Sequence, residues 1–508
     1  MSEADPAGAA SRQVPLVLFA AVVQGVFYLR NVLLLPLLTR VLGAELFGAW
    51  VKMQGLANLV TPLLGAGAIL GFTRFAPSVA ADDRGRYFWS AVLGIAVTGG
   101  LVAVGIAALG PVIRPQVYQA APASLTVCML LALGILPLVS VLGQITASYY
   151  QLTDRPHTYG TAILGQVGLL LAGAVLLAWW WGRTLWVPLV AWLCGPVLAV
   201  AWLLARIRRE TRGQADWRSL GEMVRFGAPL LPMSMMMWVV DSADRYLLTW
   251  LVPEGADAVV GVYSASYSLG GLVAMVFGPF FLFYTPAVTR LWDAGNLPEV
   301  GRLTRTMVKC GLLLALPVTA VGVTYGDLIT RCVAGASFRG DPVVVGLVMA
   351  GYCLYMVGSY AQMPLLMEKR TGTILVIGVA TAAVNVALGY LLIPLADPWG
   401  RMRGAALATT CSFGLFLLLS RVAVRGRRGF SLGGVHLVSL TGLAGLAGAC
   451  LNWGHDRGAA AAVLTAVLAA ALYGGGILVT RVITPAEMSV VRNSLLPWWT
   501  AWRRGRVG

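Results

Sequence analysis

Long apolar runs, separated by short polar or basic stretches, recur along the chain from Val14 to Val482. Because lipid offers no partner for backbone polar groups, a segment that crosses a bilayer is expected to be an α-helix of about 20 residues. The pattern predicts an all-α polytopic membrane protein with about fourteen transmembrane helices, at residues 14–38, 47–73, 88–112, 122–149, 159–181, 185–205, 226–252, 258–288, 308–330, 343–366, 373–395, 403–422, 432–452 and 459–480.

The composition favours the same fold class, because 58% of the residues are hydrophobic and 11% are charged. A soluble protein carries roughly 25% charged residues. The formal net charge of +16 comes mainly from short loops between the apolar runs and therefore does not indicate nucleic-acid binding. These basic residues gather in alternate loops, on the side that holds both ends of the chain, so the positive-inside rule predicts cytoplasmic termini.

The helix pattern divides the chain into six predicted segments. These are a disordered cytoplasmic tail, an N-lobe of six helices, a basic cytoplasmic linker, a C-lobe of six helices, two further helices and a basic cytoplasmic tail, at residues 1–13, 14–205, 206–225, 226–425, 432–480 and 481–508.

An internal repeat relates the two predicted lobes. The stretch "GAWVKMQGLANLV" (48–60) aligns without a gap to "GVYSASYSLGGLV" (261–273), with Gly48 opposite Gly261. Both stretches open a predicted helix after a short outer loop. Transporters use parallel repeats of this kind to form a site between two lobes, so the repeat predicts a central cavity.

Four charged residues lie deep inside predicted spans, Arg30 in the first helix and Asp241, Asp244 and Arg245 in the seventh. A charge at the bilayer centre costs about 2.5–3.5 kcal/mol on insertion scales, so such residues usually face protein or a hydrated pathway. Because the repeat relates the two helices, we expect both groups at a similar depth around the cavity.

The spacing of Asp241 and Arg245 favours an ion pair along one helix face. Two interpretations stay open at this point. In the first, the pair neutralises itself and only joins helices; in the second, Asp244 and Arg30 pair with each other or bind a mobile ligand.

Uncharged polar residues extend the same predicted cavity at helical spacing. Each one alone is typical of a hydrogen bond between membrane helices, but together they indicate a hydrated space, and they are Gln24, Tyr28, Asn31, Gln54, Asn58, Thr61, Tyr263 and Tyr267. Lys52 lies on another side of its helix, about a turn from the outer surface, and is interpreted as a lysine that snorkels to water, with a weaker claim to the site.

Several chemistries have no sequence signal. No glycine precedes any lysine, so a phosphate-binding loop of the GK[ST] type is absent, and the three scattered histidines indicate no metal site. The longest loop, residues 206–225, is too short for a glycosyltransferase domain. The prediction is transport without covalent chemistry and without a cofactor, and not an enzyme.

Several motifs resemble the polysaccharide-biosynthesis (Wzx-type) flippases of the multidrug/oligosaccharidyl-lipid/polysaccharide exporter (MOP) superfamily. They are "LLPLLTRVLGAELFGAW" (34–50), "FGAPLLPMSMMMWVVDSADRYLL" (226–248), the stretch 261–273 and "EKRTGTILVIGVATAAVNVALGYLLIPLADPWGRMRGAALAT" (368–409). The resemblance covers residues 14 to 425. It implies two six-helix lobes around a cavity that opens alternately to each side of the bacterial plasma membrane.

The resemblance implies an undecaprenyl-diphosphate-linked oligosaccharide as the substrate. Arg30 and Arg245 are then expected at the diphosphate, Asn31, Gln54, Asn58, Tyr263 and Tyr267 at the head group, and Asp241 and Asp244 at a coupling proton or sodium ion. Expected partners are membrane lipid and the glycosyltransferases or polymerase of the same pathway. The alternatives are a drug/cation antiporter of the same superfamily and a polymerase, ligase or scaffold of the pathway.

Overall fold

A computed structural model describes residues 6–65, 67–117, 123–153, 155–211, 214–228, 231–252, 254–395, 398–425, 434–455, 457 and 459–480. Within these ranges every regular element is a helix, α1 to α16 with one short 3-10 turn. The predicted tail at 481–508 lies outside the described residues. Helix α1 begins at Pro6, so residues 6–13, expected to be a disordered tail, are helical.

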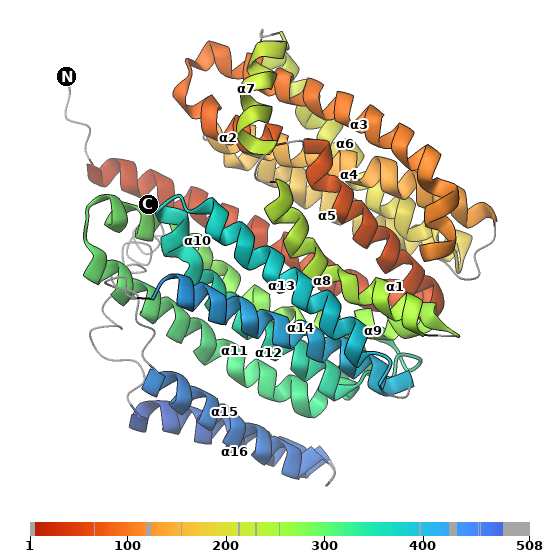
Figure 1. The fold of residues 1–508 in the computed structure, drawn as a ribbon, viewed down its shortest axis with the longest axis vertical. Helices are drawn as coiled ribbons and strands as arrows, with labels where there is room; N and C mark the ends of the chain where they lie inside the picture. The colour runs from red at the N-terminus through yellow and green to blue at the C-terminus, as the bar shows by residue number, and fades with distance from the viewer. Residues whose placement is uncertain are drawn as a thin grey trace, which may run out of the picture. The chain divides into compact units, whose positions relative to one another are not determined.

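The chain forms two compact units, and the boundaries between them along the chain fall within α1 and within α9 (Ala256–Gly270). We call Pro15–Ser264 the amino-terminal unit, and the residues from Ala265 onward, with those before Pro15, the carboxy-terminal unit. Both units consist of long helices, as Figure 1 shows.

Helix α1 (Pro6–Gly65) is two helical runs that meet at Gly43. Gly43 has φ 72° and ψ 176°, a conformation that a residue with a Cβ rarely adopts. The predicted turn between the first two helices is therefore confirmed as a sharp break at glycine. The other long helices of the amino-terminal unit cover the predicted stretches and are α3 (Ala81–Val117), α4 (Ala123–Leu152), α5 (Pro156–Trp181), α6 (Trp186–Glu210) and α8 (Leu231–Leu251).

Two short helices pack together in the amino-terminal unit, α2 (Ala68–Phe75) and α7 (Trp217–Gly227). The prediction of one helix over 47–73 is wrong, because the chain breaks before α2 at Gly67, which has φ 79°. Gly67 and Gly227 approach so closely that a Cβ on either would overlap the other's backbone. Helix α7 lies at the end of the predicted basic linker, and its amphipathic pattern is too short to indicate a span.

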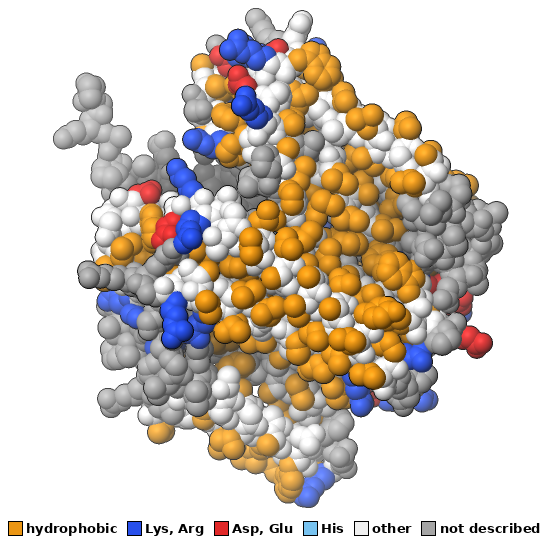
Figure 2. All heavy atoms as spheres, viewed as in Figure 1, with side chains coloured by type: hydrophobic (Ala, Val, Ile, Leu, Met, Phe, Trp, Pro, Cys, Tyr) orange, Lys and Arg blue, Asp and Glu red, His pale blue; other side chains and the backbone are white. Residues whose placement is uncertain are grey.

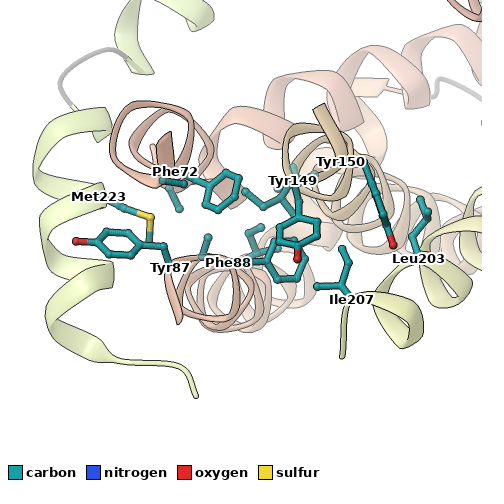
Figure 3. Close-up of a cluster of buried hydrophobic side chains, with 14 of the residues drawn as sticks. Phe72, Tyr87, Phe88, Tyr149, Tyr150, Leu203, Ile207 and Met223 are labelled. Carbon is teal, nitrogen blue, oxygen red and sulfur yellow. The ribbon is translucent and has the colours of Figure 1, made fainter. Parts of the chain in front are cut away.

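Buried aromatic and aliphatic side chains hold α2, α3, α4, α6 and α7 together (Figure 3). Phe72 and Phe88 are fully buried and meet edge to face, with ring centroids 6.1 Å apart. Tyr149 packs on Phe88, and Met223 reaches the cluster from α7. Burying each such side chain stabilises the fold by about 1.5–3 kcal/mol, so the cluster fixes the helices that carry the cavity described below.

The carboxy-terminal unit contains the end of α9 (Ala256–Gly270) and seven further helices in the described residues. They are α10 (Leu272–Asp293), α11 (Leu297–Ala334), α12 (Pro342–Met367), α13 (Thr371–Leu392), α14 (Pro398–Ala423), α15 (Gly434–His455) and α16 (Ala459–Thr480). The single helix predicted over 258–288 is interrupted at Gly271, where two consecutive glycines disfavour helix. Helices α15 and α16 form a hairpin, and α15 packs on α11.

Ten helices in the described residues are long and apolar enough to cross a membrane. Their outer surfaces carry large apolar side chains, as at Leu101, Val104 and Val463. Figure 2 shows that hydrophobic side chains dominate the visible face. A surface of this composition is stable in lipid rather than in water.

Candidate functional site

The amino-terminal unit contains a cavity of about 590 Å³. Its walls come from both runs of α1 and from α2, α4, α5 and α6. Its lining mixes polar and apolar side chains, and the polar and aromatic ones are Arg30, Gln54, Asn58, Thr61, Ser140, Gln144, Thr146, Ser148, Tyr159, Gln166 and Trp192. We call this space the polar cavity.

The polar cavity holds the guanidinium of Arg30 against the ring of Trp192. The guanidinium carbon lies 5.6 Å from the ring centroid, a cation–π distance. Both side chains are half-buried, so Trp192 orients the cation while leaving part of it accessible. A guanidinium held in this way can bind phosphate oxygens with charge-assisted hydrogen bonds.

Sequence reasoning found part of this cavity. Arg30 comes from the first run of α1, and Gln54, Asn58 and Thr61 come from the second run, so the break at Gly43 brings the predicted residues together. The side chains of Gln24, Tyr28 and Asn31 lie outside the described residues.

Residues on α4, α5 and α6 complete the polar cavity and were not predicted. Ser140, Gln144 and Ser148 form a stripe at four-residue spacing along α4, and Tyr159 and Gln166 lie seven residues apart on α5. Such spacing puts side chains on one helix face. The signal was therefore present in the sequence as two polar stripes within apolar runs.

The charged group of α8 lies in a different place. Arg245 forms an ion pair with Asp244, with 3.2 Å between Nη1 and Oδ1, and also donates a hydrogen bond to the carbonyl oxygen of Asp241. The Tyr263 hydroxyl donates to the other carboxylate oxygen of Asp244. Asp244 is 3% exposed and Arg245 is 8% exposed. Neither side chain is among the described residues that line the polar cavity.

The snorkelling interpretation of Lys52 is wrong. Its side chain is 0% exposed and forms an ion pair with Asp257, in the first turn of α9. A buried ammonium requires a paired charge because burial removes its hydration. Asp257 was not predicted as a functional residue, since nothing local in the sequence relates it to a lysine in the second run of α1.

Around this ion pair, α1 crosses α9 with almost no space between the backbones. A Cβ on Gly48 would overlap the carbonyl oxygen of Asp257, and a Cβ on Gly261 would overlap that of Ala44. The contact is reciprocal, because the repeat that aligns Gly48 with Gly261 also aligns Ala44 with Asp257. We call this contact, with the Lys52–Asp257 pair, the α1–α9 crossing.

Helix α8 adds two hydrogen bonds to the second run of α1. The Tyr246 hydroxyl donates to the carbonyl oxygen of Lys52 over 2.8 Å, and the Trp238 indole donates to that of Gly55 over 2.7 Å. The charged group of α8 (Asp241, Asp244 and Arg245) and the α1–α9 crossing therefore form one buried polar region, which joins α1, α8 and α9.

Tyr263 and Tyr267 have different surroundings although they lie one turn apart on α9. Tyr263 contacts Asp244 in the amino-terminal unit. Tyr267 belongs to the carboxy-terminal unit, where its hydroxyl accepts a hydrogen bond from that of Tyr352 over 3.5 Å. The two tyrosines do not line the polar cavity in the described residues.

The comparisons with known proteins agree with this architecture. The family model described as "Polysaccharide biosynthesis protein" matches residues 37–340. The matched range includes the second run of α1 and helices α2 to α11, while Arg30 precedes it. No curated protein matches the chain.

Solved structures share the fold at low sequence identity. "Lipid II flippase MurJ, inward closed conformation" has a TM-score of 0.66 and 14% identity, covering 94% of this chain and 100% of that chain. A multidrug resistance MATE family transporter of the MOP superfamily, in an inward-facing conformation, has a TM-score of 0.64 and 12% identity, with coverages of 78% and 94%. The Vibrio cholerae MATE transporter VcmN has a TM-score of 0.58 and 13% identity, with coverages of 83% and 99%. The chain therefore has the all-helical polytopic membrane fold of MurJ and MATE transporters.

Proposed function

Because this chain belongs to the polysaccharide biosynthesis protein family, we propose that it flips an undecaprenyl-diphosphate-linked oligosaccharide across the bacterial plasma membrane. The family match confirms the resemblance that the sequence motifs indicated. It identifies a multi-pass membrane transporter of polysaccharide biosynthesis, with a MOP-superfamily fold, and not an enzyme. The substrate and the direction of transport are the proposal.

One observation carries the proposal, the charge of the polar cavity. Among the described residues that line it, Arg30 is the one charged side chain, and none is an Asp or Glu. A cationic group in a polar, partly enclosed space favours an anionic ligand. A diphosphate bound at Arg30 would lie next to amide and hydroxyl side chains that can bind sugar hydroxyls.

The proposed topology has fourteen crossings with both termini in the cytoplasm. Two six-helix lobes, 14–205 and 226–425, alternate the access of the cavity between the two sides, and helices in 432–480 are additional. The reciprocal contact at Gly48 and Gly261 supports this repeat, because equivalent helices that cross near a pseudo-two-fold axis contact each other in this way. The head group crosses through the cavity while the polyprenyl chain stays in lipid.

Replacement of Arg30 tests the function. In proteoliposomes loaded with the lipid-linked oligosaccharide, Arg30→Ala is expected to reduce transport at least about tenfold, the loss of one charge-assisted contact. Arg30→Lys is expected to retain part of the activity, because it keeps the charge but loses the fork geometry.

Arg206→Ala is the matched control. Its guanidinium lies 5.6 Å from the Trp202 ring, as that of Arg30 does from Trp192, but it is not among the described lining residues. This variant should transport at the normal rate. Normal transport by folded Arg30→Ala protein would contradict the proposed role.

Coupling to an ion is a separate part of the proposal. Asp241 and Asp244 lie beside Arg245 in a helix that the sequence predicts to be transmembrane, and carboxylates within a membrane commonly serve proton or cation transport. Transport by Asp241→Asn and Asp244→Asn proteins should respond less than the parent to an imposed proton or sodium gradient. If both variants respond as the parent does, this part of the proposal is excluded.

A drug/cation antiporter is the alternative, because multidrug transporters share the fold. An organic cation would be repelled by Arg30, and the described lining offers it no carboxylate. Tetraphenylphosphonium is therefore expected not to compete with the lipid-linked substrate. Competition that persists in Arg30→Ala protein would favour the antiporter.

A further inference from the structure

The polar cavity contains more amide groups than charges. Gln54 and Asn58 come from α1, Gln144 from α4 and Gln166 from α5, so carboxamides reach the space from three helices. Each carboxamide offers N–H donors and a carbonyl acceptor. A sugar hydroxyl also donates and accepts, and therefore matches such a group in both directions.

Three hydroxyl side chains of the lining are already oriented by their own helices. Thr61 donates to the carbonyl oxygen of Ala57 over 2.8 Å, and Ser148 donates to that of Gln144 over 3.0 Å. Thr146 donates to the carbonyl oxygen of Gly143 over 2.8 Å. Because each proton is used in this way, the hydroxyl oxygens of Thr61 and Ser148, which are partly exposed, can meet a ligand as acceptors, whereas Thr146 is buried.

The hydroxyl oxygens of Thr61 and Ser148 discriminate between two kinds of sugar. A hydroxyl or an N-acetyl N–H supplies a proton to these oxygens, whereas a sugar carboxylate is an acceptor only. A carboxylate beside Thr61 or Ser148 would place two acceptors together and lose a hydrogen bond that it makes in water. This loss is unfavourable for binding.

The charge of the lining also disfavours a sugar carboxylate. A diphosphate bound at Arg30 already carries more negative charge than one guanidinium neutralises. Each sugar carboxylate would add a further negative charge, and the described lining holds no second cation near it. Like charges in one partly enclosed site repel each other.

We propose that the polar cavity selects lipid-linked oligosaccharides with uncharged sugars, neutral hexoses or N-acetylhexosamines, so that the diphosphate is the one anionic group of the substrate. This inference rests on the proposed function and specifies its substrate class. The cavity volume of about 590 Å³ lies within the usual range of ligand pockets, about 300–1,000 Å³.

Two matched probes test the selection. Both are undecaprenyl-diphosphate-linked trisaccharides, one with three glucose units and one with glucuronate in the middle position. With the full-length protein in nanodiscs, the neutral probe is expected to bind about tenfold more tightly or better, the cost of one unmatched polar group. The methyl ester of the glucuronate probe should bind like the neutral probe.

A cationic side chain introduced into the lining should reduce the preference for the neutral probe over the glucuronate probe. Gln144→Arg protein is expected to bind the glucuronate probe more tightly than the parent does, and Gln166→Lys is a second variant if the first does not fold. Thr158→Arg is the control, because Thr158 lies in the first turn of α5 and is not among the described lining residues. Its binding ratio should equal that of the parent.

The outcomes separate the two proposals. Equal binding of the neutral and glucuronate probes by the parent protein overturns the selection but leaves the flippase function standing. Binding of neither probe by folded protein overturns the flippase function and the selection with it. A parent that discriminates but gains no glucuronate binding in either folded cation variant contradicts the role of the lining in the selection.

Discussion

The polar cavity and the α1–α9 crossing lie in the same unit, and both contain charges within predicted membrane spans. They differ in how accessible and how paired those charges are. In the cavity, Arg30 lies over Trp192 among amides and hydroxyls, within an accessible space. At the crossing, Lys52 is completely buried and paired with Asp257. A charge within a predicted membrane span therefore indicates a binding site only when its surroundings leave room for a ligand.

The two regions also differ in what their small residues do. Glycine at the α1–α9 crossing removes space, since Gly48 and Gly261 bring backbones into contact. In the polar cavity, by contrast, Ala57 and Gly143 border the space that a ligand would fill. The crossing is therefore expected to respond to mutation through stability, and the cavity through binding.

The largest expected effect is at the buried ion pair. Asp257→Ala removes the carboxylate that neutralises Lys52 and should destabilise the fold by about 3–5 kcal/mol. The measurement is chemical unfolding of the purified protein in detergent. Asp327→Ala is the control, because its pair with Arg331 is partly exposed and should cost about 0.5 kcal/mol or less. If both variants lose the same free energy of unfolding, burial does not make the Lys52–Asp257 pair more important for stability than an exposed pair.

A second test concerns the close approach of α1 and α9. Gly48→Ala places a methyl group against the carbonyl oxygen of Asp257 and is expected to cost about 1–3 kcal/mol, the range for overpacking. Thermal unfolding in detergent measures the loss. Gly168→Ala in α5, where a Cβ would meet no atom within 4 Å, should leave stability unchanged or raise it. A stable Gly48→Ala protein would show that the crossing can move apart at little cost.

A smaller effect is expected in the polar cavity. Trp192→Ala removes the ring that orients Arg30 and should weaken binding of the neutral trisaccharide probe by about 0.5–2 kcal/mol, with unfolding little changed. Trp202→Ala, which removes the ring beside Arg206, should leave the affinity as it was. If Trp192→Ala and Trp202→Ala both lose stability and neither loses affinity, residues of the cavity act through stability, as those of the crossing do, and the proposed difference is wrong.

The smallest effect is expected outside both regions, at Asp216 before α7. Hydrogen bonds from the backbone N–H groups of Ser219 and Arg218 hold the pKa of the Asp216 carboxyl below its usual range. A lowered pKa means that the carboxylate stabilises the folded state above the pKa of the unfolded chain, near 3.9, and that this contribution is lost as pH falls through the lowered value. Asp216→Ala should therefore unfold slightly earlier than the parent at neutral pH, and the difference should vanish in acid.

Much of the fold could be predicted because apolar length is a strong signal. Helices such as α5 and α16 begin and end close to the predicted residues. The helix breaks at Gly67 and Gly271 were not predicted, since a glycine inside an apolar run only weakly disfavours helix. The amphipathic helix α7 was not predicted, because it is too short to span a membrane and lies mostly in the segment predicted as a basic linker.

The candidate site was predicted in part for a related reason. Arg30 and Gln54 stand out as polar residues in apolar helices, and the turn at Gly43 was visible between them. The partner of Lys52 was not visible, because the ion pair joins distant segments whose contact only the tertiary structure creates. The spacing predicted an ion pair between Asp241 and Arg245, whereas the guanidinium pairs with the carboxylate of Asp244 and donates to the backbone carbonyl oxygen of Asp241.

The reciprocal crossing of α1 and α9 has a consequence for the two repeats. The alignment that relates Gly48 to Gly261 also relates Lys52 to Ala265 and Asp257 to Ala44, so the positions equivalent to the buried ion pair hold two alanines. Each repeat contributes one glycine to the close backbone contact, whereas the charge pair occupies one of the two equivalent pairs of positions. The crossing is therefore symmetric in its backbone and asymmetric in its charge.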